Sequence, residues 1–253
     1  LISGKDNQKK ISAKNIIIAS GSITTEIPSF NIDEKNILSS TGALSLEKIP
    51  KKLLVVGGGY IGLEMGSVWS RLGTEVTVVE TMERIVPLSD NEISSHFLKS
   101  LKNQGLKFIL AHKVIKLSNK NNEILAEIES IKDGKKISEN FDKALISVGR
   151  KPYTKNLSLD KVGLKTLSDG SIKINENYQT NVKNIFAIGD VVSGPMLAHK
   201  AEEEGIICVE KITGQKPSLD YDIIPSIIYT NPEIASVGKT EEDLKKDNIK
   251  YKI

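Results

Sequence analysis

Cysteine is nearly missing from this sequence, since Cys208 is the one cysteine in 253 residues. A single thiol cannot form an internal disulfide, so we expect a reducing, cytoplasmic setting. No apolar run approaches the length of about 20 residues that a membrane-spanning helix needs, and no signal peptide is visible. The net charge of only +3 gives no support for a nucleic-acid partner, because acidic residues interrupt the lysines.

The remaining composition is that of a globular protein, with 39% hydrophobic and 26% charged residues. The chain begins at Leu1 rather than at a methionine, and it ends at Ile253 in what reads as the start of another element. We therefore expect a fragment of a longer protein.

Short apolar runs predict a sheet of buried, parallel strands. They cover Asn15 to Ala19, Leu53 to Val56, Glu75 to Val79, Lys143 to Val148 and Asn184 to Ile188. Helices are expected between and after them, over about Tyr60 to Leu72, from an N-cap at Asp90 to the stop at Gly105, and over about Pro195 to Ile212 with proline in the first helical position.

Alternating apolar and polar residues predict an antiparallel meander within this parallel sheet. The runs Phe108 to Leu117 and Ile124 to Ile131 are joined by the polar residues 119–122, and Asp133-Gly134 follows as a hairpin signal. Further strands are expected at Ile223 to Tyr229 and at Ala235 to Val237.

A glycine pattern, Gly57-x-Gly59-x-x-Gly62, is the strongest functional signal. It directly follows a predicted strand and opens a predicted helix, which is the context of a dinucleotide-binding turn. Gly57 would permit the tight turn, Gly59 the approach of the diphosphate, and Gly62 the close packing of helix on strand. The alternative is a glycine-rich strand–helix turn without a ligand, and the context favours the dinucleotide site.

Glu80 follows the next strand, near the offset at which an acid contacts the adenosine ribose. Its carboxylate could accept hydrogen bonds from both ribose hydroxyls. A 2′-phosphate would be repelled there by roughly 3 kcal/mol for each unit charge, at about 5 Å and an effective dielectric of about 20. NAD is therefore predicted in preference to NADP. The alternative is an exposed glutamate at a strand end.

The segment from Val55 to Gly73 resembles the dihydrolipoamide dehydrogenases, members of the pyridine nucleotide-disulfide oxidoreductase family. The same family order continues in Val148 to Tyr153, Ile188 to Asp190, Met196 to Gly205 and Tyr229 to Gly238. Serine at position 20 is a small departure, because the family usually has threonine there. The resemblance implies an enzyme that carries both FAD and NAD.

The resemblance also assigns site residues. For NAD they are Gly57, Gly58, Gly59, Tyr60, Ile61, Gly62, Leu63, Glu64, Glu80, Val114 and Gly149, with Ile61 and Glu64 near the nicotinamide. For FAD they are Ser20, Gly21 and Ser22 on one side, Asp190 at the ribitol, and Met196, Leu197, Ala198 and His199 at a helix N-terminus facing the flavin. Taken singly, most of these positions read equally well as turn, cap or core residues.

The implied fold is α/β: a doubly wound parallel-sheet NAD domain with an antiparallel meander, inserted in a partial FAD domain and followed by the start of an α+β dimerisation domain. The expected boundaries are 1–50 and 149–220 for the FAD domain, 51–148 for the NAD domain and 221–253 for the dimerisation domain. The implied partners are the lipoyl domains of 2-oxo acid dehydrogenase complexes and, for the full-length protein, a second copy of itself.

The residues that perform the family's thiol chemistry are missing from this sequence. It has no Cys-x4-Cys pair, and Cys208 lies at helical spacing from Ala201, Gly205 and Ile212, as a packing residue does. His96 and His112 are expected to be solvated. No catalytic residue and no metal ligand is assigned, so the fragment alone is expected to be inactive. Two alternatives stay open: a related flavoprotein that uses NADPH or another substrate, and a non-catalytic NAD-binding module.

Overall fold

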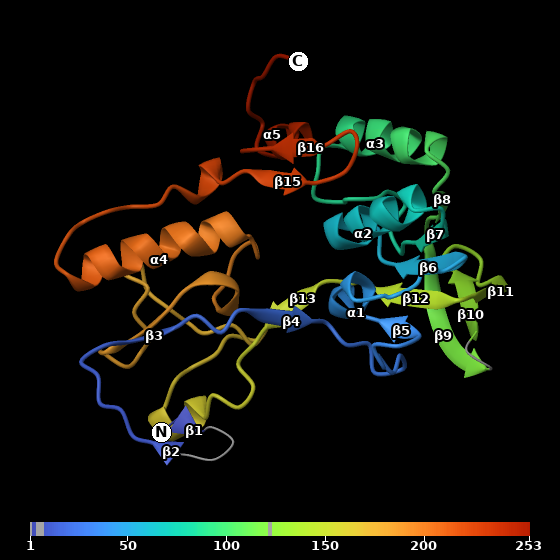
Figure 1. Cartoon of the computed structure of the whole chain (residues 1–253). Helices are drawn as coiled ribbons and strands as arrows, with labels where there is room; N and C mark the ends of the chain where they lie inside the picture. The colour runs from blue at the N-terminus through green and yellow to red at the C-terminus, as the bar shows by residue number, and fades with distance from the viewer. Residues whose placement is uncertain (1, 4–7, 121–122) are drawn as a thin grey trace. The chain divides into compact units, whose positions relative to one another are not determined.

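The computed structural model describes residues 2–3, 8–120 and 123–253, and the chain forms two compact units (Figure 1). Unit 1 comprises Leu1–Ile23 and Arg150–Asp220, and unit 2 comprises Thr24–Gly149 and Tyr221–Ile253. Residues 24–50, which were expected with the FAD domain, therefore lie in unit 2. The reason is that part of this segment forms an edge strand of the unit 2 sheet.

Unit 2 is built on a five-stranded parallel sheet with the strand order β5-β12-β6-β7-β8. The strands are β5 (Ile37–Leu38), β6 (Lys52–Val56), β7 (Glu75–Val79), β8 (Lys107–Ile109) and β12 (Lys143–Ile146). In the central strand β6, Val56 lies opposite Val79 on one side and Ile146 on the other. The predicted parallel sheet of apolar strands is confirmed for this unit.

Three helices of unit 2 accompany this sheet: α1 (Ser40–Leu44), α2 (Tyr60–Arg71) and α3 (Asn91–Asn103). Helix α2 ends before Gly73, whose φ of +102° is readily adopted by glycine. Helix α3 begins after Asp90, whose side chain accepts a hydrogen bond from the Glu92 amide. The predicted N-cap is confirmed.

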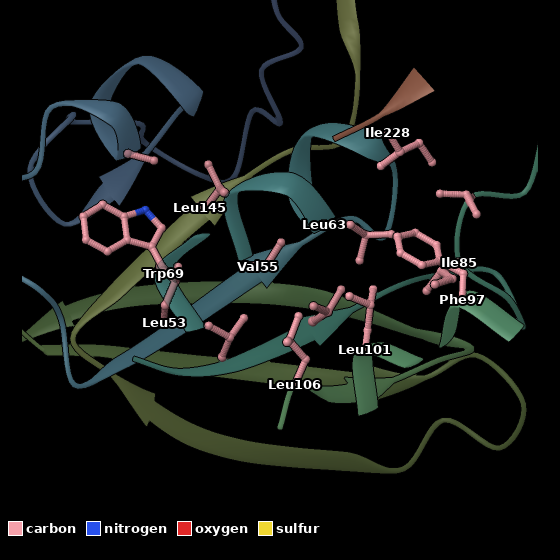
Figure 2. Close-up of a cluster of buried hydrophobic side chains, with 14 of the residues drawn as sticks. Leu53, Val55, Leu63, Trp69, Ile85, Phe97, Leu101, Leu106, Leu145 and Ile228 are labelled. Atoms are coloured by element: carbon pink, nitrogen blue, oxygen red, sulfur yellow. The ribbon is translucent and has the colours of Figure 1, made fainter. Parts of the chain in front are cut away.

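The strands of the sheet are buried on both faces because alternate side chains enter two different clusters. Leu53 and Val55 of β6 lie in a cluster with Leu63 of α2 and Phe97 of α3 (Figure 2). The intervening residues Leu54 and Val56 lie in the second cluster, with side chains from the antiparallel sheet. A period-two alternation between two cores reads in the sequence as one continuous apolar run.

The antiparallel sheet is the predicted meander, with the order β11-β10-β9. Its strands are β9 (His112–Lys120), β10 (Glu123–Ser130) and β11 (Lys136–Phe141). The predicted run from Phe108 to Leu117 was wrong as one strand. Its first part is β8 of the parallel sheet, and Ala111, with φ of +54°, breaks the chain before β9. Of the predicted connection at 119–122, residues 121 and 122 lie outside the described residues.

The C-terminal segment of unit 2 contains η3 (Tyr221–Ile223), β15 (Ser226–Ile228), β16 (Ile234–Ser236) and α5 (Glu241–Lys246). Strands β15 and β16 form an antiparallel pair. Strand β15 is shorter than the predicted run Ile223 to Tyr229, and β16 begins one residue before the predicted Ala235 to Val237. Ile228 is buried in the same cluster as Leu63 and Phe97 (Figure 2). This segment therefore packs on the helices of unit 2.

Unit 1 contains a small parallel pair, in which β3 (Ile16–Ile18) lies beside β14 (Ile185–Ala187). The expectation that β3 is buried was wrong for two residues, since Ile16 and Ile17 are 46% and 37% exposed. An apolar run predicts cover on both faces, and a pair of strands does not provide it. The other elements of unit 1 are β1 (Ile2–Ser3), β2 (Gln8–Lys9), β4 (Ser22–Thr24, of which Thr24 belongs to unit 2), β13 (Arg150–Pro152), η1 (Leu159–Val162), η2 (Gly189–Val191) and α4 (Ala198–Ile212).

Helix α4 begins three residues later than predicted. Leu197 is its N-cap, and Pro195 lies in the preceding turn, where its carbonyl accepts a hydrogen bond from the Leu197 amide. Cys208 is fully buried in this helix, as expected from its spacing, and burial raises the pKa of its thiol. Within the described residues, no helix has the length and hydropathy of a membrane span.

Candidate functional site

The turn between β6 and α2 requires glycine at positions 57 and 62. Gly57 has φ of +109°, and a Cβ on it would lie 2.5 Å from the Ser147 carbonyl oxygen. A Cβ on Gly62 would lie 2.2 Å from the Gly57 carbonyl oxygen and 2.6 Å from Ser147 Oγ. All three distances are too short for any side chain, so the geometry requires glycine at both positions, as the predicted turning and packing roles do.

Gly59 differs from the other two glycines, because the chain itself does not require glycine there. Its backbone is extended, with φ of −83° and ψ of −178°. Apart from Gly59 itself and the chain next to it, no atom of the described residues lies within 4 Å of the position that a Cβ on Gly59 would take. The space beside Gly59 is therefore open, at the N-terminus of the twelve-residue helix α2.

This open side carries positive electrostatic potential from the backbone. Gly59 is the N-cap of α2, and among the described residues no side chain caps the helix there. The first amides of a helix lack partners within the helix, and they attract anions. An open turn, a helix N-terminus and no protein cap together fit the diphosphate of a dinucleotide.

Glu80 lies beside the turn, but it contacts the turn more closely than predicted. Its side chain is buried, and Oε2 accepts a hydrogen bond of 2.6 Å from the Gly58 amide. Oε1 accepts from the Met82 amide at 2.8 Å and from Thr81 Oγ1 at 2.9 Å. A carboxylate has about four acceptor positions, so this geometry leaves room for about one ribose hydroxyl instead of two.

The loop after Glu80 holds the same glycine from its other side. The Val86 amide donates to the Gly58 carbonyl at 2.9 Å, and Val86 has φ of +39°, which is rare for a β-branched residue. A Cβ on Gly58 would lie 3.2 Å from both Ile85 Cγ2 and Glu80 Cβ. The loop from Glu80 to Val86 therefore fixes Gly58 in two ways. It bonds the amide and the carbonyl of Gly58, and it packs closely against the place that a side chain would occupy.

Ser147 was missed in the sequence. Its hydroxyl is buried at the end of β12 and donates to the carbonyls of Val56, at 2.9 Å, and Gly57, at 3.2 Å. Ser147 thus connects the end of β12 to Gly57, the first residue of the turn. Its only signal in the sequence is a polar residue within the apolar run Lys143 to Val148.

The other residues assigned to NAD lie in different environments. Tyr60 is exposed and Ile61 half-buried at the start of α2. Leu63 points into the core cluster, and its amide donates to the Gly59 carbonyl, so the structure does not bring it to the open side of the turn. Glu64 accepts a 2.8 Å hydrogen bond from the Tyr229 amide of the C-terminal segment.

Two further residues assigned to the adenosine side occupy structural positions. Val114, in β9, packs against the second core cluster. Gly149 has φ of +114°, and its carbonyl accepts a hydrogen bond from the Thr25 amide. Their assignments to NAD stay predictions.

The residues assigned to FAD come together in unit 1. Ser22 Oγ donates to Asp190 Oδ2 at 2.6 Å, and Arg150 Nε donates to Ser22 Oγ at 2.7 Å. Ser20 Oγ donates to the Tyr153 carbonyl at 2.7 Å, and the Tyr153 amide donates to the Gly21 carbonyl at 2.8 Å. The predicted neighbourhood of Ser20 to Ser22 and Asp190 is therefore present, and Arg150 completes it.

Asp190 is positioned to accept a further hydrogen bond. It is half-buried, and among the described residues Oδ1 makes no hydrogen bond. A hydroxyl of a sugar alcohol is a suitable donor to this oxygen.

The helix assigned to the flavin begins within the predicted tetrad. Met196 precedes the helix, Leu197 caps it, and Ala198 and His199 are its first residues. No side chain among the described residues caps α4 at Leu197. Its N-terminus is therefore suited to stabilise negative charge.

The histidines expected to be solvated differ from each other. His96 is exposed, with Nε2 3.9 Å from Glu92. His112 is less exposed than predicted: it is half-buried, and its Nδ1 lies 2.7 Å from the Leu110 carbonyl oxygen. In the described part of the chain, no cluster of three or more metal-ligating side chains occurs.

The parallel sheet, the glycine turn and the acid after the second strand define a dinucleotide-binding α/β protein. The chain belongs to the pyridine nucleotide-disulphide oxidoreductase family, whose sequence pattern matches residues 2–205. Residues 224–253 match the dimerisation domain of that family. The predicted resemblance and fold class are thereby confirmed.

Individual relatives carry the names of reductases and dehydrogenases. The chain is 53% identical to a mitochondrial dihydrolipoyl dehydrogenase of Caenorhabditis elegans, covering 96% of this chain and 49% of the relative. It is 51% identical to leghemoglobin reductase of Glycine max, covering 96% and 46%. The chain thus spans about half the length of these relatives.

The solved structures agree in fold. The Cu(II) complex of the HOCl-induced flavoprotein disulfide reductase RclA from Escherichia coli superposes with a TM-score of 0.88 at 26% identity. The superposition covers 97% of this chain and 55% of that one.

Proposed function

We propose that the full-length protein is an NAD-linked dihydrolipoyl dehydrogenase that contains FAD. It would reoxidise dihydrolipoyl groups and transfer the electrons to NAD. The observation that carries the proposal is the open glycine turn with Glu80 beside it, in a chain 53% identical to a dihydrolipoyl dehydrogenase. The division into FAD, NAD and dimerisation domains belongs to the same proposal.

The NAD module of this proposal is the sheet of unit 2 with its turn. The α2 amides and Gly59 would bind the diphosphate, and Glu80 Oε2 would accept one hydroxyl of the adenosine ribose. A buried carboxylate at this place opposes a 2′-phosphate, which supports NAD over NADP.

The flavin module of the proposal lies in unit 1. Asp190 Oδ1 would accept a ribitol hydroxyl, while Ser22 and Arg150 hold the other carboxylate oxygen in place. The N-terminus of α4 would stabilise negative charge at the edge of the ring. FAD and NAD, when bound, supply the electron and hydride transfer.

The thiol chemistry has to come from residues other than these 253, because a dithiol needs two cysteines and the sequence has one. Cys208 cannot substitute, since it is fully buried and its pKa is raised by burial. The fragment alone is therefore proposed to be inactive towards dihydrolipoamide.

The partners and the location are part of the proposal. The match of residues 224–253 to a dimerisation domain supports a homodimer, and the names of the relatives support lipoyl domains of 2-oxo acid dehydrogenase complexes as substrates. A cytoplasmic location rests on the single cysteine, whereas relatives from Caenorhabditis elegans and Arabidopsis thaliana are named mitochondrial. Cell fractionation distinguishes the two locations.

The direct test measures turnover by the full-length protein. Dihydrolipoamide with NAD is expected to give reduced nicotinamide, followed by its absorbance, with at least about tenfold lower kcat/KM for NADP. Glutathione disulfide with NADPH serves as the comparison for a different disulfide reductase. Turnover with that pair alone would replace the proposed activity, and NAD binding without flavin or turnover would favour a binding module.

A further inference from the structure

Helix α4 contains a buried ion pair that the proposed function does not use. Lys200 and Glu204 are one helical turn apart, with Nζ 3.1 Å from Oε1, and their side chains are 0% and 1% exposed. Burying two charges costs free energy that their mutual attraction often does not return, so such a pair is weak support for stability. A different role is needed to explain it.

The pair contacts the backbone immediately before Asp190. Glu204 Oε2 accepts a 2.6 Å hydrogen bond from the Gly189 amide, and Lys200 Nζ donates to the Gly189 carbonyl at 3.3 Å. Gly189 has φ of +74°, and a Cβ on it would lie 3.2 Å from the Ala201 side chain. Both peptide groups that flank Gly189 are thus held by the two charged side chains.

The surrounding chain makes room for this arrangement. A Cβ on Gly194 would lie 3.2 Å from Lys200 Cε, so glycine at this position leaves space for the lysine stem. Ser22, which is itself held by Arg150, donates to the Asp190 carboxylate. The backbone and the side chain of Asp190 are therefore fixed by two separate sets of residues.

We propose that Lys200 and Glu204 are positioning residues, which hold the Gly189–Asp190 turn so that Asp190 Oδ1 faces a polyol hydroxyl. The inference rests on the proposed function, in which this polyol is the ribitol of the flavin. The pair holds the turn in its binding conformation before the ligand is present. This lowers the free-energy cost of ordering the turn when the ligand binds. Neither residue touches the flavin in this arrangement.

The test uses the full-length protein and the double variant Lys200→Met with Glu204→Leu. This variant removes both charges without leaving one of them buried and unpaired. The apoprotein is expected to keep the wild-type Tm within a few degrees, while its Kd for FAD, measured by flavin fluorescence, rises about tenfold. Such a rise corresponds to a turn that occupies the competent conformation about a tenth of the time.

A matched variant separates the hydrogen bond from the charge. Lys200→Met with Glu204→Gln keeps an amide oxygen that accepts from the Gly189 amide, and it is expected to restore most of the FAD affinity. Glu203→Gln, at an exposed position on the same helix, is the control and is expected to change neither Tm nor Kd.

Hydrogen exchange of the wild-type apoprotein tests the same idea without any variant. The Gly189 amide is expected to be protected before FAD is added, because Glu204 already holds it. Free exchange of this amide overturns the proposal, and so does an unchanged Kd for FAD in the Met/Leu variant. Loss of FAD only in step with a lower Tm also overturns it, because the pair would then act on stability alone.

The outcomes also separate this inference from the proposed function. A wild-type protein that contains no flavin overturns the proposed function and, with it, the ribitol assignment. A flavin-loaded wild type whose Met/Leu variant binds FAD equally well overturns only the role of the pair.

Discussion

Glu80 has one observed contact, and the proposed function gives it a second task. It accepts a hydrogen bond from the Gly58 amide and so fixes the glycine turn, and under the proposed function its negative charge selects an unphosphorylated adenosine ribose. The sequence predicts the second task from the position of an acid after β7. It cannot predict the first, because the contact depends on how the 80–86 loop returns over Gly58.

Glu80→Gln is expected to separate these two tasks. The amide oxygen of glutamine can still accept from the Gly58 amide, but its –NH2 group then faces the Met82 amide in place of an acceptor, so NAD affinity should fall a few-fold. The lost charge no longer opposes a 2′-phosphate, so the preference for NAD over NADP should fall about tenfold or more. Isothermal titration with both nucleotides measures this, and Glu83→Gln, at an exposed position in the same loop, is the control. An unchanged preference would contradict the role of the charge.

At the scale of the element, the turn between β6 and α2 uses its glycines for different purposes. Gly62 is required by the protein, because any side chain would collide with the Gly57 carbonyl. Gly59 is not required by the protein, because the space beside it is open. Under the proposed function, the close approach of the diphosphate gives the reason for glycine at position 59.

Gly59→Ala should therefore affect NAD binding, whereas Gly62→Ala should affect the stability of the fold. Gly59→Ala is expected to change the free energy of unfolding by less than about 1 kcal/mol and to weaken NAD binding at least about tenfold. Gly62→Ala is expected to destabilise the protein by about 1–3 kcal/mol or more. Denaturant unfolding of the full-length protein, with NAD titration alongside, makes the comparison. A Gly59→Ala protein that binds NAD normally would argue against diphosphate at this turn.

The order of elements around this turn was predictable because strand, turn and helix signals are local. The start of α4 was not, since proline at 195 suits both a first helical turn and the turn before it. The exposure of Ile16 and Ile17 was also beyond prediction, because an apolar run does not say how many strands cover it. Ser147 went unnoticed, since its bonds to Val56 and Gly57 join residues about 90 positions apart.

For the whole molecule, the division into two units separates the residues that we propose for the two cofactors. The residues proposed for FAD lie in unit 1, and the glycine turn and Glu80 lie in unit 2. Each part has its own buried clusters, so a change in one site is expected to leave the fold of the other intact.

Asp190→Ala is expected to show this independence. Losing the carboxylate should lower the FAD content of the purified full-length protein, because the ribitol loses its acceptor. NAD affinity should stay within about twofold of wild type, because the residues proposed for NAD lie in a unit with its own buried clusters. Flavin absorbance and NAD titration measure the two effects, and Asp160→Ala, an exposed acid of unit 1, is the control. Equal losses of both cofactors would instead indicate general unfolding.

The hydrogen bond between Glu80 and Gly58 also constrains attempts to re-engineer coenzyme usage. Replacing Glu80 with arginine, in order to bind a phosphorylated ribose, would leave the buried Gly58 amide without an acceptor. The same substitution that changes the coenzyme preference would also remove the contact between the 80–86 loop and Gly58. A successful redesign therefore needs at least two coordinated substitutions, one for the new phosphate and one that replaces the lost acceptor.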